Sequence, residues 1–513
     1  MLDITDFPST LALISFVGLF GYIYRTRSHP SYLPPSPPGP KPLPLLGNLL
    51  SLPSAKPWET YASWSRENKS KPFGDLISVR TFGQLSVIVN TLEAAKELLE
   101  RRSAVYSDRP LIPMIEMMEW DFNLGLMPYS DKWRRGRKVF HQHFHARVAV
   151  VYQPLQEECA RALLKLLLEK PKDFLAHLRI YAAKIAMTIA YAHDVEPSGD
   201  RYIDIAERSV AMVSNSVFPG AVLVNVFPFL RNLPDWFPGT YFKTYAKRCA
   251  ALTREMRDKP FEAVKACMVD GAARPSLTMT LLEENEARGG GEAGEDVIKD
   301  VAALTYLAGE DTTVSALTTV ILALVLHPSV QRRAQAELDR VVGRACLPTF
   351  EQREALPYVG AVCRETLRWI PVTPLGVTHS AYQDDIYKGW GVPKGTHIII
   401  NAWAMLHNPE EYEDPESFKP ERFLNEDGTL NNDEVQPAFG FGRRICPGRH
   451  LASATLWIMV ASILAVYDIE KAQDDTGTDI PVSVDCTDGV VRYGSVILDF
   501  IDSVRSVLTW FLL

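Results

Sequence analysis

The sequence predicts a mainly α-helical protein with small β-sheets and a single N-terminal transmembrane helix. Apolar residues recur at three-to-four spacing through most of residues 92–370, which is the periodicity of a buried helix face. Residues 75–90 alternate around Gly83 in the manner of a short β-hairpin. An uncharged stretch, Phe7–Tyr24, lies near the N-terminus. These three observations set the expected fold class.

The composition is that of a folded globular protein. Of the 513 residues, 47% are hydrophobic and 23% are charged. The formal net charge is −8, whereas nucleic-acid-binding proteins normally carry a basic excess, so no nucleic-acid partner is expected. The seven cysteines are widely spaced and include no CxxC pair, which argues against a disulfide framework or a structural zinc site. A reducing compartment with one special thiol fits better.

Residues 1–29 are expected to form a membrane anchor. As a helix, Phe7–Tyr24 would span roughly 27 Å, enough for a thin bilayer such as that of the endoplasmic reticulum. Acidic residues precede this stretch and Arg25 and Arg27 follow it, the reverse of a secretory signal. The positive-inside rule then puts the remainder of the chain in the cytosol. A cleaved signal peptide is the alternative.

The chain after the anchor divides into three parts. Residues 30–44 form a proline-rich hinge, whose five prolines between positions 34 and 40 forbid a helix and favour a stiff extended strut. Residues 45–492 are expected to be the globular body, followed by an atypical apolar tail at 493–513. The helices expected in the body span residues 92–102, 131–145, 155–169, 174–192, 240–268, 297–326 and 449–467.

Two segments of the body are expected to lie outside regular core helices. The polar stretch 283–296, with three consecutive glycines, is predicted to be a flexible loop. Residues 217–241 are rich in Val, Phe, Pro and Trp. They either pack inside the protein or form a surface that dips into the bilayer beside the anchor, and we favour the second interpretation.

The most informative motif is FGFGRRICPG at residues 439–448. Two glycines before Cys446 permit a tight turn and close approach to a flat ligand, and Pro447 suits the first turn of a helix. The thiol would lie at a helix N-terminus beside the cation of Arg444, and both favour a thiolate. Such a thiolate suits a soft metal that arrives inside a macrocycle. From residue types alone, a buried inert cysteine is an equal alternative.

A second motif, Ala308–Thr313 (AGEDTT), lies in the middle of the predicted helix 297–326. Its small residues leave room for a ligand against the helix, and a threonine hydroxyl can bind a backbone carbonyl and bend it. An acid beside a hydroxyl is costly in an apolar helix unless it is used. The motif is either a proton relay into a dry pocket or a solvent-facing turn.

Two further patterns supply charged side chains. Glu365 and Arg368 lie at i and i+3 on one helix face, which alone could be a surface ion pair of little value, and a later PERF segment contributes Arg422. In the basic cluster 133–138, Trp133 and Arg137 share a helix face able to grip an anionic group.

These four motifs, in this order, resemble those of a cytochrome P-450, a class in which a cysteine thiolate holds haem iron. The resemblance runs from the anchor to about residue 490. The FxxGxRxCxG pattern around Cys446 is highly specific, and the other motifs support it by their order. Three segments, YSDRP (106–110), FHQHF (140–144) and WAMLHNPEEY (403–412), resemble the corresponding sequences of fungal secondary-metabolism members.

The resemblance implies a cofactor, haem b (iron protoporphyrin IX), and a role for each motif. Cys446 would be the axial thiolate ligand, whose electron density favours O–O cleavage. Asp311 and Thr312 would be the acid–alcohol pair that delivers protons to dioxygen. Glu365, Arg368 and Arg422 would form a structural triad that braces the thiolate loop. The residues implied to lie against the haem or its propionates are Ala308, Gly309, Trp133, Arg137, His379 and Arg444.

The implied reaction inserts one oxygen atom from O2 into a hydrophobic small molecule. Because no GxGxxG motif follows a strand, the electrons of NADPH would come through a separate NADPH–cytochrome P-450 reductase, docked at Arg134, Arg135 and Lys138. The Met-rich stretch 113–118 and the segments 210–223 and 372–375 match pocket regions of the family. Adaptable methionine walls suit a terpenoid or an aromatic polyketide, with plain core packing as the alternative.

The apolar tail departs from the family, whose chains usually end in a short hairpin. It is interpreted first as a misread gene boundary, and otherwise as a second membrane contact or a divergent end. An inactive haem-binding scaffold or ligand-binding protein is therefore an alternative to the monooxygenase. A haem–thiolate isomerase or dehydratase is a further alternative, against which Asp311 and Thr312 argue.

Overall fold

The computed structural model describes residues 30, 32–66, 74–217, 222–474, 476–482 and 491. The predicted anchor, Cys486 and the predicted tail lie outside the described residues. The chain divides into two compact units, each assembled from three stretches of sequence. The first unit comprises residues 1–110, 375–405 and 441–444, and the second comprises 111–374, 406–440 and 445–513.

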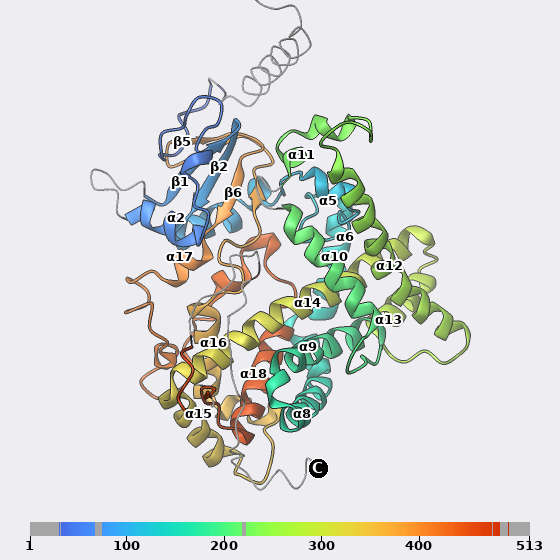
Figure 1. Ribbon diagram of the computed structural model, residues 1–513, viewed down its shortest axis with the longest axis vertical. Coiled ribbons are helices and arrows are strands. Elements are labelled where there is room, and N and C mark those ends of the chain that lie inside the picture. The colour runs from blue at the N-terminus through green and yellow to red at the C-terminus, as the bar shows by residue number, and fades with distance from the viewer. Residues whose placement is uncertain are drawn as a thin grey trace, which may run out of the picture. The chain divides into compact units, whose positions relative to one another are not determined.

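The first unit is built on a four-stranded sheet and a two-stranded ladder (Figure 1). Their strands are β1 (Leu76–Thr81), β2 (Gln84–Val89), β3 (His379–Ser380), β4 (Asp385–Tyr387), β5 (Trp390–Val392) and β6 (His397–Ile400). The sheet order is β1-β2-β6-β3, and only the β2–β6 pair is parallel. The predicted hairpin is therefore confirmed: β1 and β2 pair antiparallel, and Phe82 and Gly83 form the turn with positive φ.

Short helices surround this sheet. They are η2 (Leu49–Ser51), α2 (Pro57–Arg66), α3 (Leu92–Lys96), η3 (Glu97–Arg101), α4 (Ser103–Tyr106), α17 (Ala402–Leu406) and η10 (Gly442–Arg444). The single helix predicted at 92–102 is interrupted, since η3 is a π-helical turn. There the Glu97 carboxylate pairs with both Arg101 and Arg102.

The proline-rich hinge lies along the first unit instead of standing free. The Ser78 N–H donates to the Pro38 carbonyl oxygen at 2.8 Å, and the Gly391 N–H donates to the Pro35 carbonyl oxygen at 2.9 Å. A Cβ at Gly39 would stand 1.9 Å from the Ser78 carbonyl oxygen, so glycine is required for this close approach. The extended conformation expected of the prolines is fixed by hydrogen bonds to β1 and β5.

The second unit is almost wholly helical in its described residues. Its longer helices are α6 (Asp131–Phe144), α8 (Gln153–Glu169), α9 (Phe174–Tyr191), α10 (Arg201–Val217), α12 (Tyr241–Val269), α13 (Leu277–Ala287), α14 (Glu292–Leu326), α15 (Pro328–Val341), α16 (Pro357–Trp369) and α18 (Arg449–Val466). Its short helices are α5 (Pro113–Met117), α7 (Ala146–Ala149), η4 (Val150–Tyr152), η5 (Pro171–Asp173), α11 (Leu223–Val226), η6 (Pro228–Asn232), η7 (Phe350–Ala355), η8 (Pro420–Phe423) and η9 (Gln436–Phe439).

The predicted flexible loop at 283–296 is wrong. Helix α13 continues to Ala287 and α14 begins at Glu292, so only residues 288–291 connect them. The glutamates and alanines on either side of the glycines are good helix formers. Glu292 and Glu295 also lie in the first turn of α14, where negative charge complements the helix dipole.

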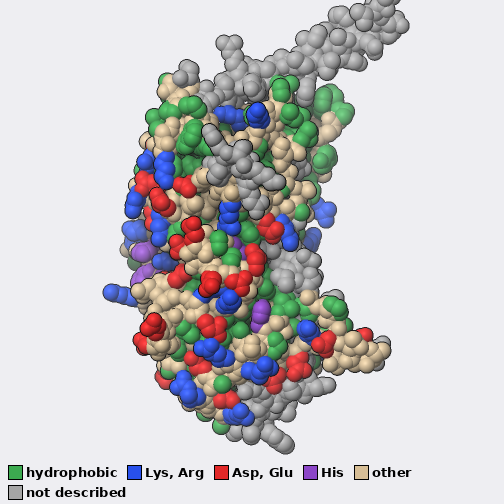
Figure 2. All heavy atoms as spheres, turned by 90° about the vertical axis from the view of Figure 1, so that its left-hand side faces the viewer, with side chains coloured by type: hydrophobic (Ala, Val, Ile, Leu, Met, Phe, Trp, Pro, Cys, Tyr) green, Lys and Arg blue, Asp and Glu red, His purple; other side chains and the backbone are tan. Residues whose placement is uncertain are grey.

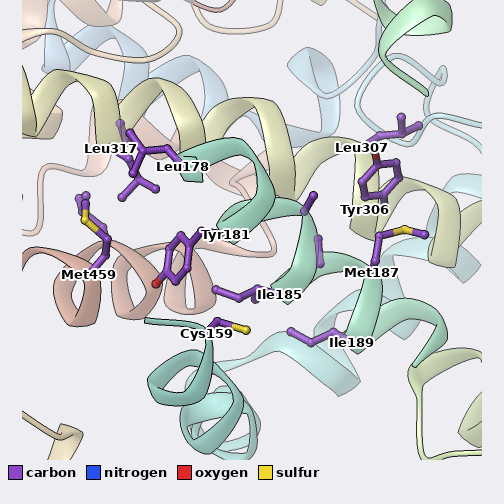
Figure 3. Close-up of a cluster of buried hydrophobic side chains, with 14 of the residues drawn as sticks. Cys159, Leu178, Tyr181, Ile185, Met187, Ile189, Tyr306, Leu307, Leu317 and Met459 are labelled. Carbon is purple, nitrogen blue, oxygen red and sulfur yellow. The ribbon is translucent and has the colours of Figure 1, made fainter. Parts of the chain in front are cut away.

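Helix α14 runs through the core of the second unit and packs against α9 and α18. Figure 3 shows Tyr306 and Leu307 of α14 in the same buried cluster as Met187 of α9 and Met459 of α18. Within the described residues, α14 and α18 are long and apolar enough to cross a membrane, but most of each helix is buried inside the protein. Both are therefore core helices.

Charges on the surface are mixed. On the face seen in Figure 2, acidic and basic side chains are interspersed with hydrophobic ones.

Two methionines of the predicted Met-rich wall, Met114 and Met118, are fully buried in the hydrophobic core. For these two residues the core-packing alternative is the better description.

Candidate functional site

Cys446 lies in a tight loop between η9 and α18. Gly440 ends η9 with φ of +80°, and the Cys446 N–H donates to the Phe439 carbonyl oxygen at 2.8 Å. Helix α18 begins at Arg449 with Gly448 as its N-cap. Pro447 therefore precedes the helix instead of occupying its first turn, because the chain is still turning at that point.

Several groups around the thiol stabilise an anionic sulfur against the effect of burial. Burial dominates and raises the pKa of Cys446, while the backbone N–H groups of Gly448 and Arg449 and the charges of Arg137 and Arg449 oppose this shift. The prediction that helix-terminal N–H groups face the sulfur is correct. The cations beside it, however, are Arg137 and Arg449. Arg444, the cation that the sequence suggested, donates from Nε to the Ser107 carbonyl oxygen at 2.8 Å within the first unit.

The middle of α14 contains a partly exposed stretch between two buried ones. Residues 301–307 are buried, but Ala308 is exposed and Gly309 is partly exposed. The Thr312 hydroxyl donates to the Ala308 carbonyl oxygen at 2.7 Å, as expected for a threonine inside a helix. The helix nevertheless continues without interruption from Glu292 to Leu326.

Two partly exposed stretches fit a flat group held by sulfur. One comprises residues 308, 309 and 311–313 of α14, and the other is residues 445–453, which include Cys446 and the first turn of α18. Helices α14 and α18 pack together in the same unit. The small side chains of the first stretch and the N–H donors around the thiol suit a planar macrocycle whose metal takes one soft ligand.

The first unit holds a separate cluster of basic side chains, composed of Arg109, His379 and Arg444. The buried Arg109 donates from Nη1 to the Val377 and Thr378 carbonyl oxygens at 2.6 and 2.9 Å. Burial and the charges of Arg109 and Arg444 hold the pKa of His379 well below its ordinary value. This cluster is suited to an anionic group such as a carboxylate.

Sequence reasoning identified His379 and Arg444 but not Arg109. Arg109 belongs to the YSDRP stretch, which served only as a sign of resemblance. The Nδ1 atom of His379 lies 2.7 Å from the Tyr106 carbonyl oxygen. A carbonyl oxygen can only accept, so Nδ1 carries the proton in this tautomer.

Trp133 and Arg137 lie on α6 in the second unit. The buried Trp133 donates its indole N–H to the Leu124 carbonyl oxygen at 3.1 Å, so this donor already has a partner. Arg137 is close enough to Cys446 for each to affect the pKa of the other. The structure therefore associates Arg137 with the thiol, and contact of either residue with a propionate remains a prediction.

Glu365, Arg368 and Arg422 form a buried ion-pair triad. Arg368 donates to both carboxylate oxygens of Glu365, at 2.6 and 2.8 Å. Arg422 donates from Nε to Glu365 Oε1 at 3.2 Å. The side chains of Glu365 and Arg368 are 0% exposed, so the surface-pair alternative is wrong. Arg368 also donates to the Leu406 and Pro415 carbonyl oxygens, which ties α16 to the last residue of α17 and to the segment that follows it.

The comparisons with known proteins agree on one family. The family model described as cytochrome P450 matches residues 37–487. The chain is 41% identical over 464 residues to a cytochrome P450 monooxygenase of Armillaria gallica, covering 90% of each chain. It is 39% identical over 467 residues to another of Coprinopsis cinerea, covering 89% of each. It is 36% identical over 488 residues to the tryptamine 4-monooxygenase of Psilocybe cyanescens, covering 94% of this chain and 95% of that protein.

Proposed function

This chain is a monooxygenase of the cytochrome P450 family, and from that premise we propose that it inserts one atom of O2 into a hydrophobic small molecule with electrons from NADPH. Enzymes of this family use O2, a hydrophobic substrate and a redox partner, and they bind haem b through a cysteine thiolate. The observation that carries the proposal is the thiolate loop, in which N–H donors and two arginine charges surround Cys446.

Cys446 is the proposed axial ligand of the haem iron. When bound, the haem supplies the activation of O2. Ala308 and Gly309 are proposed to lie against its face, where α14 is open. By the family pattern, Trp133, Arg137, His379 and Arg444 are proposed as partners of its propionates.

Asp311 and Thr312 are the proposed route for protons. The Asp311 carboxylate is 27% exposed and pairs with Arg179, so it can exchange protons with solvent. The Thr312 hydroxyl hydrogen is directed to the Ala308 carbonyl oxygen, which leaves the lone pairs of its oxygen to accept. The two side chains can therefore hold a proton beside the open part of α14.

The test is spectroscopic. Carbon monoxide added to the dithionite-reduced holoprotein should give the absorption maximum of a thiolate-ligated haem. Cys446→Ser should abolish that maximum, while Cys363→Ser, which changes a buried cysteine elsewhere in the second unit, should keep it. A maximum typical of imidazole-ligated globins in the unsubstituted protein would overturn the proposal.

A separate reductase is the proposed source of electrons, docked on α6. Arg135 and Lys138 are exposed there, whereas Arg134 pairs with Asp131 and lies over the Tyr129 ring. Reversing the charge of Arg135 and Lys138 should slow reduction at low salt about tenfold, since electrostatic steering contributes roughly 10- to 1,000-fold to association. Arg208→Glu, on α10, is the control. Unchanged reduction at low salt would remove the docking surface.

We further propose a single-pass anchor in the endoplasmic reticulum membrane, with the body in the cytosol. Residues 222–241, called here the aromatic loop, support a membrane contact beyond the anchor. In this loop Trp236 is 81% exposed and Phe237 is 42% exposed, and large apolar side chains are rarely left together in water without a partner.

The substrate proposal remains a terpenoid or an aromatic polyketide of fungal secondary metabolism. The tryptamine 4-monooxygenase relative justifies adding indole amines to a substrate screen. Ligand-induced spin-state changes of the purified holoprotein would identify binders. Turnover of any binder with reductase and NADPH would eliminate the inactive-scaffold alternative.

A further inference from the structure

Glu310 is a buried carboxyl group that the proposed function does not use. It precedes Asp311 on α14 and is 5% exposed, whereas Asp311 is partly exposed. Tyr306, one turn earlier on the same side, is 3% exposed. Among the described residues, neither Glu310 Oε1 nor the Tyr306 hydroxyl has a hydrogen-bond partner of normal geometry. Burying a carboxyl group without a hydrogen-bond partner costs free energy of folding, which suggests a role for Glu310 beyond packing.

Glu310 and Asp311 share one cation. The Nη1 atom of Arg179, on α9, lies 3.6 Å from Glu310 Oε1 and 3.6 Å from Asp311 Oδ1. The same nitrogen lies 3.2 Å from Glu207 Oε1 on α10. The carboxylate oxygens of Glu310 and Asp311 are therefore close to each other, because both lie 3.6 Å from the same nitrogen. Glu207 is exposed to solvent.

Three carboxylates share this guanidinium within the part of the chain that the structure describes, and repulsion between like charges favours protonation of the least solvated one. Glu310 is the least solvated of the three, with a side chain that is 6% exposed, against 27% for Asp311 and 42% for Glu207. Burial raises the pKa of Glu310 to about 7. This value already includes the smaller effects of the neighbours: the Tyr306 hydroxyl and the charge of Arg179 lower the pKa, while the charges of Asp311 and Glu207 raise it.

We propose that Glu310 is a positioning residue that stores a proton beside Asp311 and returns it when Asp311 has given its own proton up. In this step the Glu310 O–H bond breaks and an O–H bond forms on Asp311. Glu310 becomes a carboxylate paired with Arg179, and solvent reprotonates it past Glu207, so the charge of the cluster is restored. The inference rests on the proposed function, in which Asp311 handles protons.

The first test asks whether Glu310 holds a proton in the holoprotein. Infrared difference spectra between about pH 5.5 and 8.5 should show the carbonyl band of a protonated carboxyl group that titrates near pH 7. Glu310→Gln should remove this band, and Glu310→Asp should restore a titrating band. Asp204→Asn, an exposed acid on α10, should leave it in place. The absence of the band, or its persistence in Glu310→Gln, would overturn the inference.

The second test asks whether the stored proton is used. With purified reductase and NADPH, hydrogen peroxide released per NADPH consumed should change across the same pH range in the unsubstituted enzyme. We expect Glu310→Gln to raise this ratio at neutral pH by roughly tenfold, below the 10²–10⁴-fold effect of a direct general acid, and to flatten its pH profile. An unchanged profile would refute the role of Glu310. Failure of the unsubstituted holoprotein to consume NADPH would instead refute the proposed function.

Discussion

Gly442, four residues before the proposed ligand, is a position at which the first unit requires the absence of a side chain. Its φ is +57°, and a Cβ would stand 1.9 Å from the Leu99 carbonyl oxygen. Both the backbone conformation and the close contact exclude other residues. The glycine of the FxxGxRxCxG pattern is therefore required by the packing of η10 on η3.

Gly442→Ala should lower the free energy of unfolding by about 3 kcal/mol or more, because left-handed strain adds to a clash with backbone. Gly389→Ala is the matched control: its φ is +84°, but nothing lies within 4 Å of the added Cβ. The control should lose only about 1 kcal/mol. Chemical denaturation of both variants would check this, and equal losses would contradict the role of the Leu99 contact.

The Glu310 carboxyl group should make stability depend on pH. Its pKa rises from 4.5 to about 7 on folding, so between these values the folded protein holds a proton that the unfolded chain has released. Stability is then lost as pH rises through this window, and the loss is complete above pH 7. Glu310→Gln should be more stable than the unsubstituted protein at pH 8 by about 1–3 kcal/mol.

The same comparison at pH 4.5 should show a much smaller advantage for Glu310→Gln, and Asp204→Asn should show no comparable pH-dependent gain. Urea unfolding at the two pH values would measure both. An advantage of the same size at both would mean that the variant acts through packing and not through the proton.

Residue by residue, the sequence predicts a site best where the signal is local. Cys446, Asp311 and Thr312 stand in short motifs, which left alternatives open one by one and indicated a site only through their order along the chain. Glu310 lies in one of those motifs, but its burial depends on how α9 and α10 pack against α14. The role of Arg109 likewise becomes visible only in the structure, through its hydrogen bond to Val377, which is distant in the sequence.

At the scale of elements, α16 is held by the triad around Glu365. Glu365→Gln keeps the volume but leaves Arg368 buried without its counter-charge. We expect a loss of about 3–5 kcal/mol, the usual effect of breaking a buried pair, and a collapse in the yield of folded holoprotein. Arg208→Ala removes an exposed pair with Asp204 and should cost at most about 0.5 kcal/mol. Normal yield and stability of Glu365→Gln would contradict this account.

Periodicity predicted several of the long helices, although not α10 or α15, and missed the short strands. Helices such as α6 and α9 agree closely with their predicted ranges because a buried face repeats over several turns. Strands β3 to β6 contain two to four residues each, too few to show alternation. The pairing of β6 with β2 is also invisible locally, because it joins residues about 300 positions apart.

For the whole molecule, the sequence suggested one body while the described chain forms two compact units from six stretches. No composition shift marks these boundaries, since each unit mixes early and late segments. At this scale the sequence reports net charge and apolar composition. Because the net charge is −8, attraction to anionic lipids is not expected, and the proposed membrane contact depends on apolar side chains.

Trp236→Ser combined with Phe237→Ser should reduce contact of the aromatic loop with lipid. In neutral-lipid vesicles, quenching of tryptophan fluorescence by brominated acyl chains should fall relative to the unsubstituted protein, because the single tryptophan of the loop is lost. Trp236→Phe distinguishes loss of the probe from loss of contact. Val269→Ser, an 87% exposed apolar side chain at the end of α12, should leave quenching unchanged. Equal quenching in all variants would exclude the loop from the bilayer.

The proline-rich segment adds a mechanical consequence. Since its backbone is hydrogen-bonded to Ser78 and Gly391, a force on the chain before residue 32 acts directly on the strands of the first unit and not through a flexible linker. Such an attachment transmits torque as well as tension. A body attached in this way would be restrained in its orientation as well as in its distance from the membrane. Another membrane-attached protein would therefore meet it in fewer relative orientations.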